Sequence, residues 1–373
     1  MAAAAAAARA SVTIVAVLLI LASSGLPAAE SHVVIGAYNK TCPQAEEVVL
    51  QEMTAIVGRS PELAGAVLRL FSVDCLLTGC DGSILLDSTA GNTAEKDAPM
   101  SQGVRGYEVV DAVKAKLEAA CPGVVSCADA LALAARDSVR LTKGPFIALP
   151  TGRRDGNRSV AAEVAPNSPA PGANITDLIR LFAKVNLTAK DVAVLSGAHT
   201  IGKARCATVA PRLYDFGGQN GASDPTLDAN YTAALRRQCK PGGGGGDAGA
   251  LVDLDPGTPT TFDAGYYSLV ATRRGLLATD AALLLNGATA AYVARQANAT
   301  SPDEFFADFA ASFVAMSKIG VLTHHKGEIR QVCSKVNPPS PSAPAGSSGG
   351  AAAASSPLSY QLAAAALAVA LVL

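Results

Sequence analysis

Eight cysteines constrain the fold of this 373-residue chain more than any other feature of its sequence. They lie at Cys42, Cys75, Cys80, Cys121, Cys127, Cys206, Cys239 and Cys333. An even number of cysteines predicts four disulfides if the chain enters an oxidising compartment. Zinc binding is the competing use, but no C-x-x-C pair occurs and the chain has only four histidines.

Residues 1–29 indicate entry into such a compartment. They contain one arginine, a short apolar run and small residues at the end, which is the pattern of a secretory signal peptide. A membrane anchor is the alternative, but the apolar run is short for a membrane span. Asn-x-Ser/Thr sequences suit a glycosylated secreted protein. They occur at Asn39, Asn157, Asn174, Asn186, Asn230 and Asn298.

The carboxyl-terminal end carries a second targeting pattern. Residues 338–350 are rich in Pro, Ser and Gly, and residues 351–373 end in the apolar tail LAAAALAVALVL. Small residues, a spacer and an apolar terminus predict a GPI-anchor signal, with attachment at Ser347, Ser348 or Gly349. A plain hydrophobic tail or another targeting extension is the alternative. Residues 30–337 remain as the folded domain.

Helical periodicity dominates this domain. Apolar residues recur at three- and four-residue spacing in the ranges 44–58, 61–73, 105–119, 127–139, 176–185 and 302–318. Strand signals are few and short. The formal net charge of −1 gives no indication of nucleic-acid binding. The sequence therefore predicts an all-α domain with long loops.

Several segments resemble the plant secretory (class III) haem peroxidases. They read RLFSVDCLLTGCDGSILLD (69–87), GVVSCADALALAARDSV (123–139), TGRRD (151–155), LSGAHTIGKARC (195–206), LDPGTPTTFDAGYY (254–267) and GEIRQVC (327–333). The resemblance runs from about residue 33 to residue 337. It implies a two-lobed, all-α haem peroxidase fold, with haem b between a distal and a proximal half. It also implies a monomer outside the cell or in the cell wall that oxidises small phenolic donors with hydrogen peroxide.

The same resemblance assigns the cysteine pairs and the iron ligand. The implied disulfides are Cys42–Cys121, Cys75–Cys80, Cys127–Cys333 and Cys206–Cys239. His199, in SGAHT, stands at the position of the proximal haem ligand. A ligating imidazole needs an acceptor for its other nitrogen, and the family's aspartate for this role falls on Asp280 in GLLATD.

Two calcium sites are implied as well. The distal site would use side chains of Asp74, Asp81 and Ser83 and carbonyls near Leu77 and Gly79. The proximal site would use Thr200, Asp255, Thr258, the carbonyl of Thr261, and Asp263. Oxygen atoms clustered on tight loops are what a hard cation such as calcium prefers. Turn-forming Asp and Ser residues would explain any one of these positions, but not two full sets.

The distal catalytic position departs from the family pattern. The family reads R-L-H-F-H-D-C where this chain reads RLFSVDC, so Arg69 matches and Val73 replaces the distal histidine. That histidine takes a proton from peroxide and later returns it, which requires a lone pair and a pKa near the working pH. Valine has neither, and the guanidinium of Arg69 can stabilise negative charge but cannot act as the base. The segment AEKDAPMSQGVRG also lacks the asparagine that orients this histidine in the family.

The edge of the implied haem site is altered too. Glu62 and Ala66 stand where several relatives present Arg and Ser to the haem propionates. Arg205 is a candidate to hold a propionate instead, because these carboxylates need a cation or hydrogen-bond donors. Pro150, in ALPTGRRD, is expected at the entrance for donor substrates.

Three functions follow. The first is peroxide-dependent oxidation of phenolic donors, with peroxide activation strongly impaired by Val73. The second is a non-catalytic glycoprotein at the cell surface that binds haem and calcium, held at the plasma membrane if the GPI signal is used. The third is a scaffold that binds calcium but little haem.

Overall fold

The computed structural model describes residues 33–169, 173–241 and 249–338. The expected signal peptide, nearly all of the Pro/Ser/Gly-rich segment and the GPI-type signal lie outside the described residues. The described helices and strands belong to the unit that ends at Asn337. Within the described ranges, no helix combines the length and the apolar character needed to cross a membrane.

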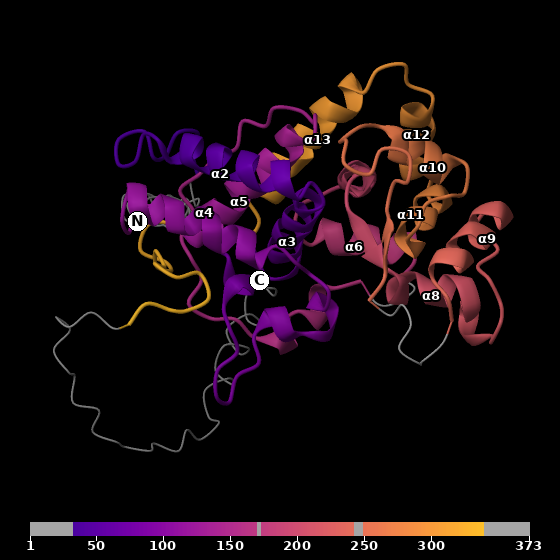
Figure 1. Ribbon diagram of the computed structural model, residues 1–373, viewed down its shortest axis with the longest axis horizontal. Helices are drawn as coiled ribbons and strands as arrows, with labels where there is room; N and C mark the ends of the chain where they lie inside the picture. Colours follow the sequence, from indigo (N-terminus) through magenta and orange to yellow (C-terminus); the bar gives the residue numbers. More distant parts are fainter. Residues whose placement is uncertain (1–32, 170–172, 242–248, 339–373) are drawn as a thin grey trace, which may run out of the picture. The chain divides into compact units, whose positions relative to one another are not determined.

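Four helices form the first half of the fold. They are α2 (Ala45–Arg59), α3 (Leu63–Leu77), α4 (Tyr107–Ala120) and α5 (Cys127–Leu141). Helix α5 packs against the other three, and α2 packs along α4, as their neighbouring ribbons show in Figure 1. The hydroxyl of Ser126 caps α5 by accepting a hydrogen bond from the Asp129 N–H, which satisfies one free donor of the first turn.

The second half contains shorter helices. They are α6 (Ile175–Ala183), α7 (Ala189–Ser196), α8 (Cys206–Tyr214), α9 (Ala229–Gln238), α10 (Gly265–Ala271), α11 (Ala278–Ala282) and α12 (Gly287–Ala297). Helix α13 (Asp303–Met316) packs against both α7 and α3, so it joins the two halves. The all-α, two-lobed architecture predicted from the sequence is confirmed.

Short elements fill the connections. The two strands β1 (Lys203–Arg205) and β2 (Leu251–Asp253) pair antiparallel, with Ala204 opposite Val252. The 3-10 turns are η1 (Ser83–Leu85), η2 (Glu95–Asp97), η3 (Pro99–Ser101), η4 (Ala161–Glu163), η5 (Ala165–Asn167), η6 (Gly197–Thr200), η7 (Phe216–Gly218) and η8 (Leu283–Leu285).

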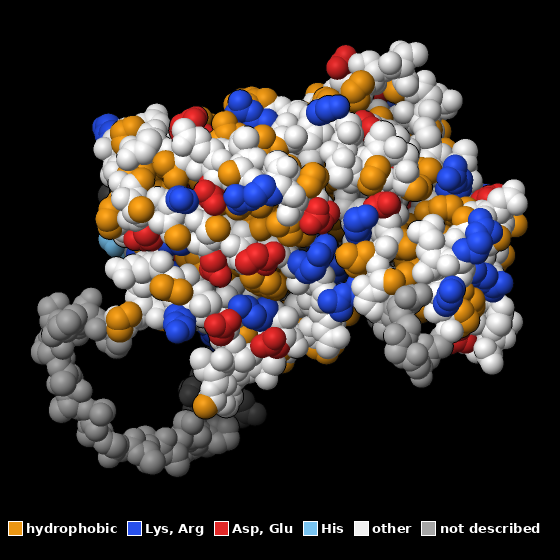
Figure 2. All heavy atoms as spheres, viewed as in Figure 1, with side chains coloured by type: hydrophobic (Ala, Val, Ile, Leu, Met, Phe, Trp, Pro, Cys, Tyr) orange, Lys and Arg blue, Asp and Glu red, His pale blue; other side chains and the backbone are white. Residues whose placement is uncertain are grey.

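The core follows the apolar faces of the long helices. In the larger cluster of buried side chains, Phe71 of α3 lies against Phe313 of α13 with ring centroids 5.1 Å apart. A smaller cluster lies under α8, α9 and β2. On the face shown in Figure 2, positive and negative side chains are interspersed, in keeping with the small net charge.

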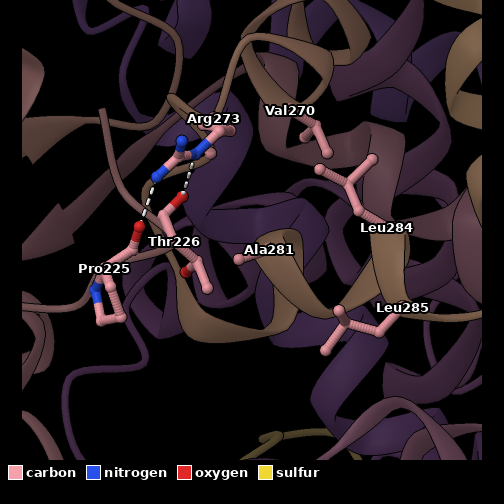
Figure 3. Close-up of a pocket in the computed structure, with 8 residues that line it drawn as sticks. Pro225, Thr226, Val270, Arg273, Ala281, Leu284 and Leu285 are labelled. Carbon is pink, nitrogen blue, oxygen red and sulfur yellow. Dashed lines mark hydrogen bonds between the residues drawn. The ribbon is translucent and has the colours of Figure 1, made fainter.

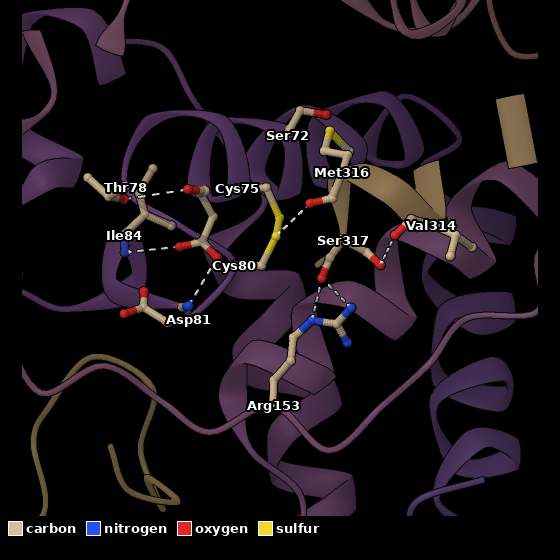
Figure 4. Close-up of a disulfide and its surroundings, with 12 residues drawn as sticks. Ser72, Cys75, Thr78, Cys80, Asp81, Ile84, Arg153, Val314, Met316 and Ser317 are labelled. Carbon is tan, nitrogen blue, oxygen red and sulfur yellow. Dashed lines mark hydrogen bonds between the residues drawn. A yellow bond between two sulfur atoms is a disulfide. The ribbon is translucent and has the colours of Figure 1, made fainter. Parts of the chain in front are cut away.

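All four implied disulfides are present. The pairs are Cys42–Cys121, Cys75–Cys80, Cys127–Cys333 and Cys206–Cys239. Figure 4 shows the Cys75–Cys80 bridge against the end of α13, where Cys80 Sγ lies 3.1 Å from the carbonyl of Met316. Helix α3 runs through Leu77, although the periodicity predicted an end at residue 73. The disulfide therefore begins on the helix, since Cys75 lies within its last turn.

Candidate active site

One cavity brings together Arg69 and His199. It has a volume of about 350 Å³, and its wall includes parts of α3, α6, α7, η6 and β1. Arg69 comes from α3 and His199 from η6. Most of the lining is apolar, and the remaining ionisable side chains are Glu62, Arg105 and Lys203. An apolar cavity with one imidazole and several cations fits a large apolar cofactor that carries carboxylates.

Two glycines let α3 approach the segment that carries His199. A Cβ placed on Gly65 would lie 2.7 Å from the Cα of Gly202, closer than real side chains come to a backbone. Gly202 also has a φ of +96°, which disfavours other residues. Both glycines line the cavity. A larger residue at Gly65 would move the two walls of the site apart, and one at Gly202 would strain the backbone.

His199 is held by a buried carboxylate. Its Nδ1 lies 2.8 Å from Oδ1 of Asp280, and the hydroxyl of Tyr266 donates to the same oxygen at 3.0 Å. The other oxygen of Asp280 accepts the Leu277 N–H at 2.7 Å, which fixes the carboxylate at the start of α11. With Nδ1 engaged by Asp280, Nε2 is the nitrogen available as a ligand.

Three arginines, Arg69, Arg105 and Arg205, gather at this cavity. The pKa of Arg69 is lowered by burial among the cavity walls and by the positive charges of Arg205 and Arg105. Arg205 does not line the cavity itself, but it packs behind Gly103, where an added Cβ would lie 2.8 Å from its Nε. In the part of the chain that the structure describes, the ion pairs involve other arginines. Arg105 and Lys203 are cavity cations that the sequence reasoning missed.

Val73 opens onto a second pocket beside the cavity, which we call the annex. The annex has a volume of about 210 Å³. Its lining is Ser72, Val73, Leu76, Leu77, Met100, Asn167, Ser168, Pro169, Leu178, Leu181, Phe182 and Val185. Five of these residues, Ser72, Leu76, Pro169, Leu178 and Phe182, also line the cavity, so the two spaces adjoin. None of the annex residues has a titratable side chain.

The proline at the cavity is not the one expected. Pro169 lies on the wall of both the cavity and the annex. Pro150 is absent from these walls, and its carbonyl accepts a hydrogen bond from the buried guanidinium of Arg153 at 2.8 Å. Arg153 also pairs with Asp129, which anchors the TGRRD segment in the core. The family resemblance had indicated Pro150 for the substrate entrance, whereas Pro169 is the proline on the cavity wall.

The expected distal calcium residues form a tight cluster at the end of α3. Asp74 accepts hydrogen bonds from the Gly82 and Ile84 N–H groups at 3.0 and 3.4 Å, and Asp81 accepts the Ser83 N–H at 3.0 Å. Burial raises the pKa of Asp74 well above its usual value, and the charges of Asp81 and Glu95 raise it further. Buried carboxylates that repel one another in this way favour a cation.

Glu95 is an addition to this cluster. Its Oε2 accepts hydrogen bonds from Thr78 at 2.7 Å and from Ser83 at 3.3 Å. Burial raises the pKa of Glu95, and the charge of Asp81 contributes. The carbonyls of the two expected backbone ligands already accept hydrogen bonds. Leu77 accepts one from Asn167 Nδ2 at 2.6 Å, and Gly79 accepts one from the Asp81 N–H at 2.8 Å.

The expected proximal calcium residues also come together. Thr200, the residue after His199, donates to Asp263 Oδ1 at 3.2 Å and lies 3.5 Å from the Thr261 carbonyl. A Cβ on Gly265 would lie within 3.6 Å of oxygens from Asp263, Asp255 and Thr258, so these oxygens face one point. Burial raises the pKa of Asp255, and the charge of Asp263 adds to the effect.

Carboxylates alone do not complete either site. Among the described residues, no three or more His, Cys, Asp or Glu side chains form a group that could hold a metal ion by themselves. A calcium ion at either place would therefore depend on hydroxyl and carbonyl oxygens, which are ordinary calcium ligands.

A third pocket has a different set of lining residues. It has a volume of about 250 Å³, with Val270, Leu284 and the largely exposed Leu285 among its lining residues. Figure 3 shows Arg273 at its edge, where the guanidinium donates to the carbonyls of Pro225 and Thr226. The pocket contains none of the site residues expected from the sequence.

An all-α fold with a histidine–aspartate pair in an apolar cavity fits the class of haem-binding oxidoreductases. Residues 49–299 match the family model described as Peroxidase. The chain is 50% identical to Peroxidase 1 of Oryza sativa subsp. japonica over 321 residues, which cover 86% of this chain and 97% of that protein. It is 46% identical to Peroxidase 27 of Arabidopsis thaliana, in a match that covers 81% of this chain and 92% of that protein. It is 45% identical to Peroxidase 39 of Arabidopsis thaliana, in a match that covers 86% of this chain and 98% of that protein. The chain therefore belongs to the peroxidase family, among its plant members, and this membership supports a peroxidase-type function.

Proposed function

We propose that this protein is a secreted haem peroxidase in which peroxide activation is strongly impaired. The proposal rests on the composition of the annex. Neither Val73 nor any other residue that lines the annex has a titratable side chain that could accept a proton from peroxide. Haem, when bound, would supply the iron at which peroxide is reduced and phenolic donors are oxidised. His199 would hold that iron, and Arg105, Lys203 and Arg205 are the candidates to hold its carboxylates.

The proximal side retains what iron binding requires. Asp280 accepts a hydrogen bond from His199, which orients the imidazole and raises its basicity. Tyr266 and the Leu277 N–H hold Asp280 in turn. Calcium at the proximal site would fix Thr200, the next residue in the chain, and thereby the position of His199.

The distal side retains only part of the catalytic set. Arg69 can stabilise negative charge that develops on a bound oxygen atom. It cannot take the first proton from peroxide, because a guanidinium stays protonated. Among the described residues that line the cavity, Glu62 is the only one with a carboxylate, and it lies seven residues before Arg69, or about 10 Å along a helix. Among the described residues that line the cavity, none therefore offers a basic group beside Arg69 for the proton transfers.

A second function is supported by the same observation. The chain would then be a non-catalytic glycoprotein that binds haem and calcium at the cell surface. The retained His199–Asp280 pair and both oxygen clusters favour binding, and they do not depend on Val73.

One preparation of the secreted protein separates these functions. A Soret absorption band with one haem per chain would exclude the scaffold with little haem. Mixing with hydrogen peroxide in a stopped-flow spectrometer then measures how fast the Soret band changes. We expect a rate at least about 10²-fold below that of an ordinary plant peroxidase measured alongside. A rate equal to that of the relative would contradict the impairment, and no measurable reaction would favour the non-catalytic glycoprotein.

Release from membranes by a phosphatidylinositol-specific phospholipase tests the GPI anchor separately.

A further inference from the structure

We propose that Arg69 and the annex together bind an anionic aliphatic amphiphile, such as a medium-chain fatty acid carboxylate. The carboxylate would pair with Arg69, and the hydrocarbon chain would occupy the annex beside Val73. This site needs no proton transfer and no redox step. It can therefore be tested whether or not the protein reacts with peroxide.

The annex is suited to a flexible hydrocarbon. Its lining is mainly aliphatic, with Val73, Leu181 and Val185 among its side chains and Phe182 as its one aromatic ring. A dry apolar cavity of about 150 Å³ is large enough to bind benzene, so a volume of about 210 Å³ holds a longer apolar group. Met100 adds a side chain that adapts its shape to a bound chain.

The positive charge in the cavity that adjoins the annex selects an anion. The positive charges of Arg205 and Arg105 repel that of Arg69, and Arg69 takes no part in the ion pairs found among the described residues. An anionic group beside Arg69 relieves this repulsion and forms charge-assisted hydrogen bonds. A cationic amphiphile would add to the repulsion, and a neutral one would leave Arg69 unpaired.

Helix α3 aligns the two parts of the site. Arg69 and Val73 are four residues apart and therefore project from one face of the helix. The helix continues to Leu77, which also lines the annex. Arg69 and Leu77 are separated by about 12 Å along the helix axis. Ser72 and Leu76 line both the cavity and the annex between them. A chain that starts at Arg69 and follows α3 thus remains in contact with apolar side chains.

The test measures binding to the secreted protein by isothermal titration calorimetry. Acetate, hexanoate, octanoate and decanoate vary the tail at a constant head group, and decanol removes the charge at a constant tail. Each methylene buried in the annex should raise the affinity about fourfold, until the annex is full. Decanoate should bind about tenfold tighter than decanol, which cannot form the charged hydrogen bond.

Two variants, each with a matched control, test whether Arg69 and the annex form the binding site. Arg69→Gln should weaken decanoate binding about tenfold, whereas Arg59→Gln, at an exposed position at the end of α2, should not change it. Val73→Phe should remove most of the gain from the longer tails, whereas Leu285→Phe, in the third pocket, should not. If Val73→Phe does not fold, as judged by circular dichroism, Leu181→Phe blocks the annex from another helix.

The proposal is overturned if decanol binds as tightly as decanoate, because the tail alone would then explain binding. It is also overturned if Arg69→Gln behaves like Arg59→Gln, or if affinity does not rise with tail length. None of these results depends on peroxide, so they leave the proposed impairment of the enzyme untouched.

Discussion

Val73→His should increase the rate at which this protein reacts with hydrogen peroxide. The substitution returns a group with a lone pair to the face of α3 that carries Arg69. The introduced imidazole would lie in the apolar annex, and both burial and the charge of Arg69 would keep its pKa below about 6.5. It would therefore be neutral at pH 7 and able to accept a proton.

The expected gain is about 10²-fold, the lower end of the range for a positioned acid–base group. The upper end requires a partner that orients the imidazole. The annex offers three polar side chains, Ser72, Asn167 and Ser168, and each already donates a hydrogen bond to a backbone carbonyl. Their oxygen atoms can still accept a hydrogen bond from the imidazole. The existing bonds of these side chains, however, are to the backbone and do not serve to orient a residue at position 73.

Stopped-flow absorbance at the Soret band measures the rate over a range of pH. The gain should be full above the pKa of the introduced imidazole and disappear below it, because the protonated ring cannot act as a base. Val73→Leu is the matched control, since it changes the shape of the side chain without adding a lone pair. The reasoning is wrong if Val73→Leu and Val73→His give the same rate, or if the unchanged protein already reacts as fast as an ordinary relative.

Three further predictions concern the metal sites and the disulfides. Asp280→Ala should weaken haem retention about 10- to 100-fold, measured as Soret loss to a haem acceptor, because His199 loses its hydrogen-bond partner; unchanged retention would contradict this role. Asp263→Ala should reduce bound calcium from two equivalents to one in elemental analysis, and chelation should lower the melting temperature of the unchanged protein more than that of the variant. Replacing Cys206 and Cys239 with Ser should lower the free energy of unfolding by about 4 kcal/mol in denaturant titrations, since their bridge closes a loop of 33 residues; a change below about 1 kcal/mol would contradict this loop-closure argument.

The long helices could be predicted from the sequence, and many short ones could not. Helices α2, α4, α5 and α13 were expected within a few residues of their observed ends, because each carries an apolar stripe over three or more turns. Helix α12 was missed because its sequence GATAAYVARQA consists mainly of small residues, with few large apolar side chains to mark a buried face. It packs against α7 and α10, so contacts distant in the sequence define it as a helix.

The residues of the candidate site could also be predicted only in part. The pairing of His199 with Asp280 followed from the family resemblance, and the structure contains it at 2.8 Å. Arg105 and Pro169 were not expected on the cavity wall. Both lie in connecting segments, and the path of such a segment depends on tertiary contacts that no local pattern reveals. The annex was missed for the same reason, since its walls come from α3, α6 and the connections around Met100 and Asn167.

The contacts that hold the end of α3 do not depend on Val73. The residues that hold the end of α3 are Asp74 and Cys75, through the carboxylate cluster and the disulfide. Val73 takes no part in either, and its partly buried side chain packs against the core. In an annex without titratable groups, a valine leaves no polar atom unpaired, whereas a histidine without an orienting partner would lose part of its hydration. The proposed loss of the base and the proposed distal calcium site are therefore compatible, because consecutive side chains of a helix point in different directions and Val73 does not share the contacts of Asp74 and Cys75.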